Sequence, residues 1–356
     1  MYYYRPSQQK GIAAKPPRSR KNTGRRVSRG RKTVIKPPRR RSGFARCLKV
    51  LLVIVLILAL SVSALYFLPV GVFSSHDKNT YAAYEKLPKG YTHVLLIGLD
   101  VNSSDTSRSD TMMILSVGKG NLFLTSLQRD TGVYIEGYKG LQRLNAAYAY
   151  GGAELLLRTV NRNFGLDITR YALVDYESFP KLIDIMGGLD VTDISAAEAE
   201  QINKNMYDVL RRRYKKGSLS ESAAAELFEK EFLLRSGDLH LSGLQALGYA
   251  RIRVLDSDYG RTNRQRRLIK AAFERFKQLK ADPAALIKLG IAGIDAVKTN
   301  MGPLEIISLA EKAALSDFKN QTRLPVNGTY TDEGGMFYNV DYNANHAAFV
   351  SFIYGS

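Results

Sequence analysis

Two aspartates and an arginine stand at the ends of three strand-like runs, a spacing that could bring them to one place. An apolar run of strand length ends at Asp100, a second begins just after Asp110, and a third leads into Arg129. Two carboxylates, phosphate oxygens and water are ligands that suit a hard cation such as Mg²⁺. The runs cover Thr92–Leu99, Thr111–Val117 and Leu122–Leu127.

Turn chemistry between the second and third runs decides whether these residues meet. Gly118–Asn121 supplies turn residues, so the two runs are predicted to form a hairpin. Asp110 and Arg129 then lie at the same sheet edge, and Asp100 joins them if its strand is parallel to the third. Taken as an isolated pair, the two aspartates could equally cap turns, where Asp is common.

A second group of basic residues follows much later in the chain. Arg251 and Arg253 are two apart and on a strand would face the same side. Arg261 and Gln265 are four apart in a helical run, so both can point toward the protein body. Arginine forks match phosphate oxygens in pairs, and the four arginines together favour a diphosphate, although each alone could be a solvated surface charge.

The charge of the chain is concentrated at its start. The formal net charge is +19, but residues 1–46 hold 16 Lys and Arg and no acidic residue. The rest of the chain is nearly balanced, which weakens any prediction of nucleic-acid binding. Residues 1–46 are predicted to be a disordered basic tail, retained in the cytoplasm and attracted to anionic membrane lipids.

An uncharged stretch follows the tail. Val50–Phe73 is long enough to span a bilayer, so residues 47–73 are predicted to be one transmembrane helix. The basic excess before it places the N-terminus inside and the C-terminal domain outside the cell membrane. A cleaved signal peptide is the competing interpretation, but the basic leader is too long for one. Residues 74–90 are expected to be an extracellular linker and residues 91–356 one α/β or α+β domain.

Several enzyme classes lack their sequence signatures here. The one cysteine, Cys47, lies at the membrane edge, so the exported part offers no disulfide or thiolate metal site. The four histidines are scattered, and the chain has no G-x-S-x-G, Walker A or G-x-G-x-x-G motif. Ordinary protease, P-loop and dinucleotide-binding functions are therefore disfavoured.

At the residues described above the sequence resembles the LytR-CpsA-Psr family of cell-wall glycopolymer ligases. The resemblance implies an α/β fold, an α-β-α sandwich with a central mixed β-sheet and a hydrophobic pocket for a polyprenyl tail. It also implies transfer of a glycopolymer from polyprenyl diphosphate to a peptidoglycan hydroxyl. The matching stretches are Leu95–Asp100, Arg108–Thr111, Ser126–Thr131, Leu144–Gly152, Gly187–Asp190, Tyr249–Arg253 and Asp258–Gln265.

The resemblance assigns expected roles to individual side chains. Asp100 and Asp110 match metal-associated aspartates, with Mg²⁺ or Mn²⁺ as the expected cofactor. The matches to diphosphate-binding residues are Arg129, Arg251, Arg253 and Arg261, with Gln265 alongside. Asp258 matches an acidic residue at the arginine cluster. Arg143 stands where Lys often precedes the Asn-Ala pair, and its role in diphosphate binding is a looser prediction. Gln128 replaces a usual Pro.

The chemistry is open at two points. The general base is Asp100, Asp110, Asp130 or Asp258, and the sequence does not choose among them. Two other functions share the same site: a non-catalytic binder or regulator of lipid-linked glycans, and a diphosphatase that transfers to water. The prenyl slot could be lined by Ala153–Phe164 and Tyr171–Met186, although such apolar stripes usually belong to the core.

The remaining segments complete the predicted domain. Residues 193–237 are predicted to be a helical excursion near the pocket or rim. The C-terminal part is expected to hold helices at Pro283–Val297 and Gly302–Phe318, a last strand at Phe337–Val340 and a short helix near Asn345–Ile353.

Overall fold

The computed structural model describes residues 86–100, 108–233, 235–256, 258–279, 282–331 and 335–355. By its contacts the chain divides into two units, Met1–Ala64 and Leu65–Ser356, and all described residues belong to the second. The predicted tail, spanning helix and most of the predicted linker lie outside the described residues. No helix within the described ranges is both long and apolar enough to cross a membrane.

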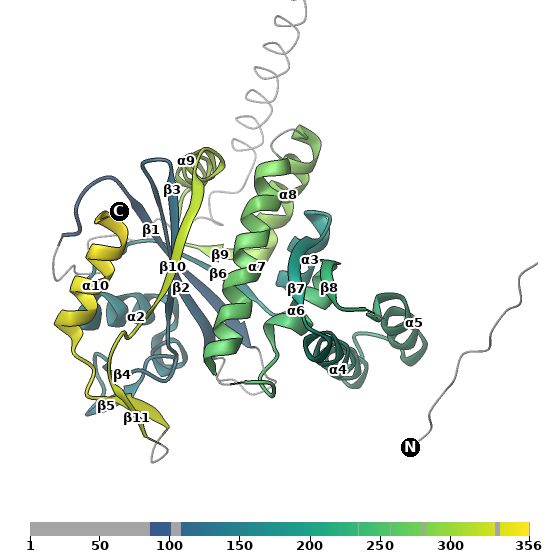
Figure 1. Cartoon of the computed structure of the whole chain (residues 1–356), viewed down its shortest axis with the longest axis horizontal. Coiled ribbons are helices and arrows are strands. Elements are labelled where there is room, and N and C mark those ends of the chain that lie inside the picture. The colour runs from purple at the N-terminus through teal and green to yellow at the C-terminus, as the bar shows by residue number, and fades with distance from the viewer. Residues whose placement is uncertain are drawn as a thin grey trace, which may run out of the picture. The chain divides into compact units, whose positions relative to one another are not determined.

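A six-stranded mixed sheet forms the centre of the domain (Figure 1). Its order is β10-β3-β2-β1-β6-β9. Strands β1, β2 and β3 are antiparallel neighbours, whereas β6 is parallel to β1 and β10 is parallel to β3. The strands are β1 Thr92–Asp100, β2 Arg108–Gly118, β3 Asn121–Leu127, β6 Tyr171–Asp175, β9 Val297–Thr299 and β10 Asp317–Leu324.

The predicted hairpin is confirmed as β2 and β3. Lys119 and Gly120 both have positive φ, 51° and 72°, in the turn between them, the backbone pattern that matches the twist of two-residue hairpins. Val117 then pairs with Leu122 and Met112 with Leu127. Because β1 is also antiparallel to β2, it runs in the same direction as β3, the condition that brings Asp100 to the edge occupied by Asp110.

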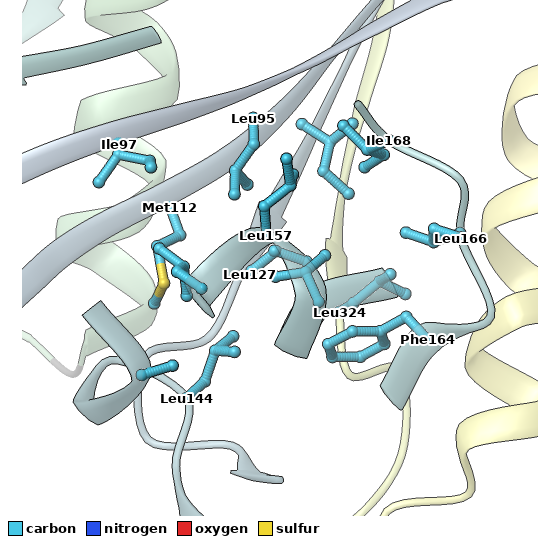
Figure 2. Packing of buried hydrophobic residues seen from close by; sticks show 14 of the residues in the cluster. Leu95, Ile97, Met112, Leu127, Leu144, Leu157, Phe164, Leu166, Ile168 and Leu324 are labelled. Carbon is cyan, nitrogen blue, oxygen red and sulfur yellow. The ribbon is translucent and has the colours of Figure 1, made fainter. Parts of the chain in front are cut away.

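Helices cover both faces of the sheet. On one face, α2 (Ala146–Phe164) and α10 (Tyr342–Tyr354) bury a core against alternate residues of β1, and Figure 2 shows Leu157 and Phe164 of α2 in this cluster. On the other face, α7 (Asp258–Leu279) and α9 (Pro303–Ala314) pack through Phe273 and Leu309 against Val117 and Leu122. This is the α-β-α arrangement that the resemblance implied.

A second hydrophobic core stabilises a lobe beside the sheet. It joins the hairpin of β7 and β8 to five helices and to one side of α7, and α4 begins with a capping box between Ser195 and Glu198. The excursion at 193–237 is therefore helical, as predicted. The elements are α3 Ser178–Ile185, β7 Leu189–Ile194, α4 Ala196–Lys215, α5 Glu221–Glu231, β8 Gly237–Leu241, α6 Gly243–Ala250 and α8 Pro283–Ala296.

The C-terminal part differs from prediction chiefly in strands that were not predicted: β9, β10 and β11. The helix predicted over Gly302–Phe318 ends at Ala314, because Asp317–Leu324 forms β10 at the sheet edge beside β3. The helix at α8 and the last strand, β12 (Met336–Tyr338), lie where expected, and α10 starts three residues early. The small strands β4 (Gly132–Tyr134), β5 (Leu141–Arg143) and β11 (Thr329–Thr331) complete the fold.

A buried histidine makes the stability of this domain depend on pH. His93 in β1 is 7% exposed, and its two ring nitrogens lie 2.8 Å from Ser116 Oγ and 2.9 Å from Tyr354 Oη. Burial, with a smaller effect of Arg170, lowers the pKa of His93 from 6.5 to about 4. Below pH ~6.5 the unfolded chain takes up a proton at His93 that the folded protein does not. The free energy of unfolding therefore falls by roughly 3 kcal/mol as the pH drops from 6.5 to 4.

Titrated chemical denaturation of the full chain checks this expectation. A His93→Gln variant should lose stability less steeply than the unsubstituted chain between pH 6.5 and 4. Equal pH slopes for His93→Gln and the unsubstituted chain would contradict the assignment.

Candidate active site

Asp110 in β2 is the centre of a cluster of arginines. Its Oδ1 accepts a hydrogen bond from Arg129 Nη1 at 3.2 Å and its Oδ2 from Arg253 Nη2 at 2.5 Å. Its backbone oxygen lies 3.4 Å from Arg261 Nη2. Burial opposes ionisation of Asp110, but the charges of Arg129, Arg253 and Arg261 outweigh it and lower its pKa. Asp110 is therefore an ionised carboxylate at neutral pH.

The sheet places the first half of this cluster as predicted. Arg129 follows β3 and reaches Asp110 across the edge shared by β2 and β3. Asp100 ends β1 opposite Arg108, beside a break in register between Gly98 and Leu99. The backbone of Asp100 thus lies at the same sheet edge as Asp110. The structure does not describe the side chain of Asp100 or that of Asp258 at the start of α7.

The second half of the cluster comes from the end of α6 and the start of α7. The strand considered for Arg251 and Arg253 is wrong, because Ala250 ends a helix and Arg251 caps it. Both arginines nevertheless line one cavity. Arg261 and Gln265 line it too, as their helical spacing predicted, and Gln265 Nε2 donates to Ala250 O at 3.3 Å.

The cavity has a volume of about 260 Å³ and lies between the sheet and helices α3, α6 and α7. At one end it has the arginines and Asp110, and beyond them its wall is mostly aliphatic and aromatic. The apolar lining residues are Leu96, Ile97, Leu99, Ala172, Val174, Tyr176, Phe179, Leu247, Ala250, Leu268 and Ile269. Such a space suits a ligand with an anionic head and an apolar tail.

Of the two segments predicted to line this slot, one does so. Tyr171–Met186 contributes Ala172, Val174, Tyr176 and Phe179. Ala153–Phe164 does not line it, because its apolar stripe on α2 is buried in the core on the opposite face of the sheet.

Arg143 joins the cluster through an intermediate carboxylate. Asp130 Oδ2 accepts from Arg129 Nε at 3.3 Å, and Asp130 Oδ1 lies 3.7 Å from Arg143 Nη1. Asp130 is thereby placed to orient Arg129, and Arg143 is not among the residues that line the cavity.

Two residues of the site were not singled out by the sequence. The guanidinium of Arg251 lies 4.3 Å from the ring centre of Tyr176, whose buried hydroxyl has no hydrogen-bond partner among the described residues. Arg264 is 4% exposed and pairs with Glu198 at 2.8 Å and Asp256 at 2.5 Å. It also donates to Ile252 O, so it holds the loop that carries Arg253. Because several arginines follow one another on this helix, the sequence alone does not show that Arg264 is a structural residue and Arg261 a residue of the cavity.

The comparison with known families matches this site and its surroundings. The model of the LytR_cpsA_psr family matches residues 72–349, which include every element that lines the cavity. The chain belongs to the LytR-CpsA-Psr family. The resemblance noted in the motifs is thus confirmed over most of the length of the chain.

Individual LytR-CpsA-Psr relatives are similar at moderate identity. The polyisoprenyl-teichoic acid–peptidoglycan teichoic acid transferase TagU of Halalkalibacterium halodurans is 29% identical over 254 residues, 69% of this chain and 72% of that protein. TagU of Oceanobacillus iheyensis is 32% identical over 194 residues, 52% of this chain and 51% of that protein, so the match spans about half the length of this relative.

The fold is also found in a solved structure of the family. YwtF (TagT), a LytR-CPS2A-psr family protein with bound octaprenyl pyrophosphate lipid, has a TM-score of 0.52 at 22% identity. The match covers 75% of this chain and 92% of that one. The central mixed sheet with helices on both faces is therefore the architecture of a known LytR-CpsA-Psr protein.

Proposed function

We propose that this protein is a membrane-anchored phosphotransferase that moves a glycopolymer from a polyprenyl diphosphate carrier to a hydroxyl of peptidoglycan. The observation that carries the proposal is the apolar cavity that ends at Asp110 and the arginines. Relatives named as teichoic acid transferases and a family structure with bound octaprenyl pyrophosphate support it. The polymer itself is not specified by these residues.

The side chains suggest how the transfer proceeds. The forks of Arg251, Arg253 and Arg261 bind diphosphate oxygens and stabilise the charge that develops on the leaving phosphate. The acceptor oxygen attacks the sugar-proximal phosphorus, its new P–O bond forms, and the bond to the prenyl-side bridging oxygen breaks. Polyprenyl phosphate leaves, and the hydroxyl proton passes to a carboxylate base, for which Asp100, Asp110, Asp130 and Asp258 remain candidates. Arg129, oriented by Asp130, completes the anion site.

A divalent cation fits this site together with the substrate. The described residues contain no group of three acidic, His or Cys side chains that could hold a metal. Asp110 is ionised, and Mg²⁺ is commonly held by one or two carboxylates with phosphate oxygens and water. Asp110, with Asp100 at the end of β1, would hold it. When bound, Mg²⁺ would neutralise charge on the diphosphate.

The anchoring is part of the same proposal. The basic residues 1–46 remain in the cytoplasm, residues 47–73 span the membrane, residues 74–90 form a linker, and residues 91–356 act outside the cell. The support is the sequence alone: an uncharged stretch at Val50–Phe73, preceded by 17 basic residues and followed by few.

A transfer assay separates the proposed activity from its two alternatives. The full chain is supplied with a labelled polyprenyl diphosphate glycan, with or without peptidoglycan, in Mg²⁺ or in EDTA. Covalent attachment of label to peptidoglycan that requires Mg²⁺ supports the phosphotransferase. Release of label to water alone would indicate a diphosphatase, and binding without turnover in every condition would indicate a non-catalytic binder. Attachment that persists in EDTA would overturn the metal requirement.

Filling the cavity should act on the lipid tail and not on the head group. Ile269→Trp places a large ring among the apolar lining residues, so long prenyl chains lose room to bury. We expect the affinity for an octaprenyl diphosphate to fall roughly a hundredfold, with that for a five-carbon prenyl diphosphate unchanged. Isothermal titration measures both, and Val326→Trp, at an exposed site outside the cavity, serves as the control. Equal losses for both ligands would show that the variant disturbs the arginines instead.

A further inference from the structure

Two helices distant from the arginines expose aliphatic side chains in regular stripes. On α9, Leu304, Ile306 and Ile307 are 77%, 37% and 42% exposed, and Leu315, which caps the C-terminus of the helix, is 81% exposed. On α8, Ile287 and Ile291 are 47% and 62% exposed and lie one turn apart. Leu304 and Ile307 are three residues apart and Ile287 and Ile291 are four apart, so each pair lies on one side of its helix. Ser308 and Glu311 are the polar members of the α9 stripe.

These exposed side chains do not belong to the hydrophobic cores of the domain. The inward side of α9 already packs through Leu309 and Ala313 against the sheet, and that of α8 through Leu286 and Leu289 in the lobe. The outward side of a helix on a soluble domain is normally polar. Exposed aliphatic side chains that gather on one side mark a surface that contacts something else.

The position of α9 relates the stripes to the start of the domain. Lys312 Nζ lies 3.4 Å from Thr92 Oγ1 at the first residue of β1, and Glu305 pairs with Arg170 just before β6. Figure 1 shows α9 on one side of α7 and α8 on the other, both beside its upper part. Asp100 stands at the other end of β1, about 30 Å along a nine-residue strand. The exposed side chains of α9 therefore lie at the end of the sheet opposite the arginines. Helix α8 begins beyond the end of α7 and runs back to Val297, which pairs with Val174 of β6.

The chain that precedes the domain indicates what covers this end. Twelve residues, 74–85, separate the apolar stretch Val50–Phe73 from Lys86 and can reach at most about 40 Å. The surface around the entry point carries exposed lysines beside the exposed acidic residues Glu311 and Asp317, and the lysines can attract anionic lipid head groups. The exposed lysines here are Lys86, Lys89, Lys119, Lys288 and Lys312.

We propose that the outward faces of α8 and α9, defined by Ile287, Ile291, Leu304, Ile307 and Leu315, dock on the outer surface of the lipid bilayer. The inference rests on the membrane anchoring in the proposed function. It also agrees with the cavity: Leu268 and Ile269 follow Gln265 on α7 toward the end of the helix that approaches α8. In this orientation the cavity extends from the arginines along α7 in the direction of the bilayer.

Lipid quenching of a local fluorophore tests the docking without any need for activity. In a Cys47→Ser background, single cysteines at Leu304, Ile291 and Val326 are labelled with an environment-sensitive dye. Val326 is a matched control, 53% exposed and just beyond the end of β10 that pairs with Leu127 at the site edge. The full chain is reconstituted in vesicles of phosphatidylcholine and phosphatidylglycerol that carry a spin-labelled lipid.

Quenching at positions 304 and 291 that exceeds quenching at 326 severalfold is the expected result. Equal quenching at the three positions, or none, would overturn the docking. A blue shift at 304 that depends on protein density and not on spin-labelled lipid would also overturn it, because a second copy would then cover the surface. A transfer assay that fails while quenching persists would reject the proposed function and leave the docking intact.

A paired substitution adds a functional readout. Ile291→Asp with Leu304→Asp should lower turnover of a carrier held in the bilayer about tenfold, the size expected when aliphatic contacts with lipid are lost. Turnover of a short-chain carrier dissolved in water should stay unchanged. An equal fall for both carriers would show damage to the domain and reject the docking interpretation of this variant, with circular dichroism as the check on folding.

Discussion

Replacing Asp110 by Asn should abolish transfer while leaving diphosphate binding intact or tighter. The carboxylate accepts hydrogen bonds from Arg129 and Arg253, so in the free protein it occupies the forks that would bind phosphate. Its lowered pKa means that the substitution removes a full negative charge at neutral pH. We expect turnover to fall about a thousandfold and affinity for prenyl diphosphate in EDTA to stay equal or rise up to about tenfold.

Separate measurement of binding and turnover decides this prediction. Titration in EDTA gives the affinity, and the transfer assay in Mg²⁺ gives kcat. Asp190→Asn is the matched control, since Asp190 is an exposed aspartate that pairs with His240 away from the cavity. A loss of affinity as large as the loss of turnover would mean that Asp110 serves mainly to position the arginines.

Features that depend on short stretches of sequence could be predicted. The β2–β3 hairpin follows from two apolar runs and one turn, and it fixes Asp110 near Arg129. The helical spacing of Arg261 and Gln265 likewise survives in α7. In each case the geometry is set by residues within one element or two adjacent ones.

Features set by tertiary contacts could not be predicted from the sequence. β10 lies at a sheet edge and is polar except for Phe318 and Leu324, so it lacks the alternation that marks a half-buried strand. The apolar stripes of Ala153–Phe164 and Tyr171–Met186 look alike in sequence, yet opposite faces of the sheet bury them. Arg251 and Arg253 converge on the cavity because α6 ends there, which no local pattern indicates.

The two arginines Arg261 and Arg264 show the same limit within one helix. They are three residues apart and both almost fully buried, at 2% and 4% exposed. Arg261 faces the cavity and Asp110, whereas Arg264 faces Glu198 of α4 and Asp256. The helical segment 193–237 therefore supplies Glu198, the partner that makes Arg264 a structural residue.

Alanine at these two positions should consequently give opposite phenotypes. Arg261→Ala removes one of several arginines around the Asp110 carboxylate. The remaining arginines then repel one another less, which offsets part of the stability lost with the packing of the Arg261 side chain. We expect a modest change in Tm and a fall in transfer of about 100- to 1,000-fold. Arg261→Lys should not restore transfer, because an ammonium lacks the planar fork that binds two phosphate oxygens.

Arg264→Ala should instead damage the fold. Burial opposes ionisation of Glu198, but a hydrogen bond from Ser195 and the charge of Arg264 outweigh it and lower the pKa of that carboxyl. Without Arg264 the carboxylate loses its partner and the loop at Ile252 loses a hydrogen bond, for a loss of about 3 kcal/mol in the free energy of unfolding. Denaturation and transfer assays on both variants test the contrast. Similar loss of stability in the two would remove the distinction, since the arginine facing Asp110 would then be as structural as its neighbour.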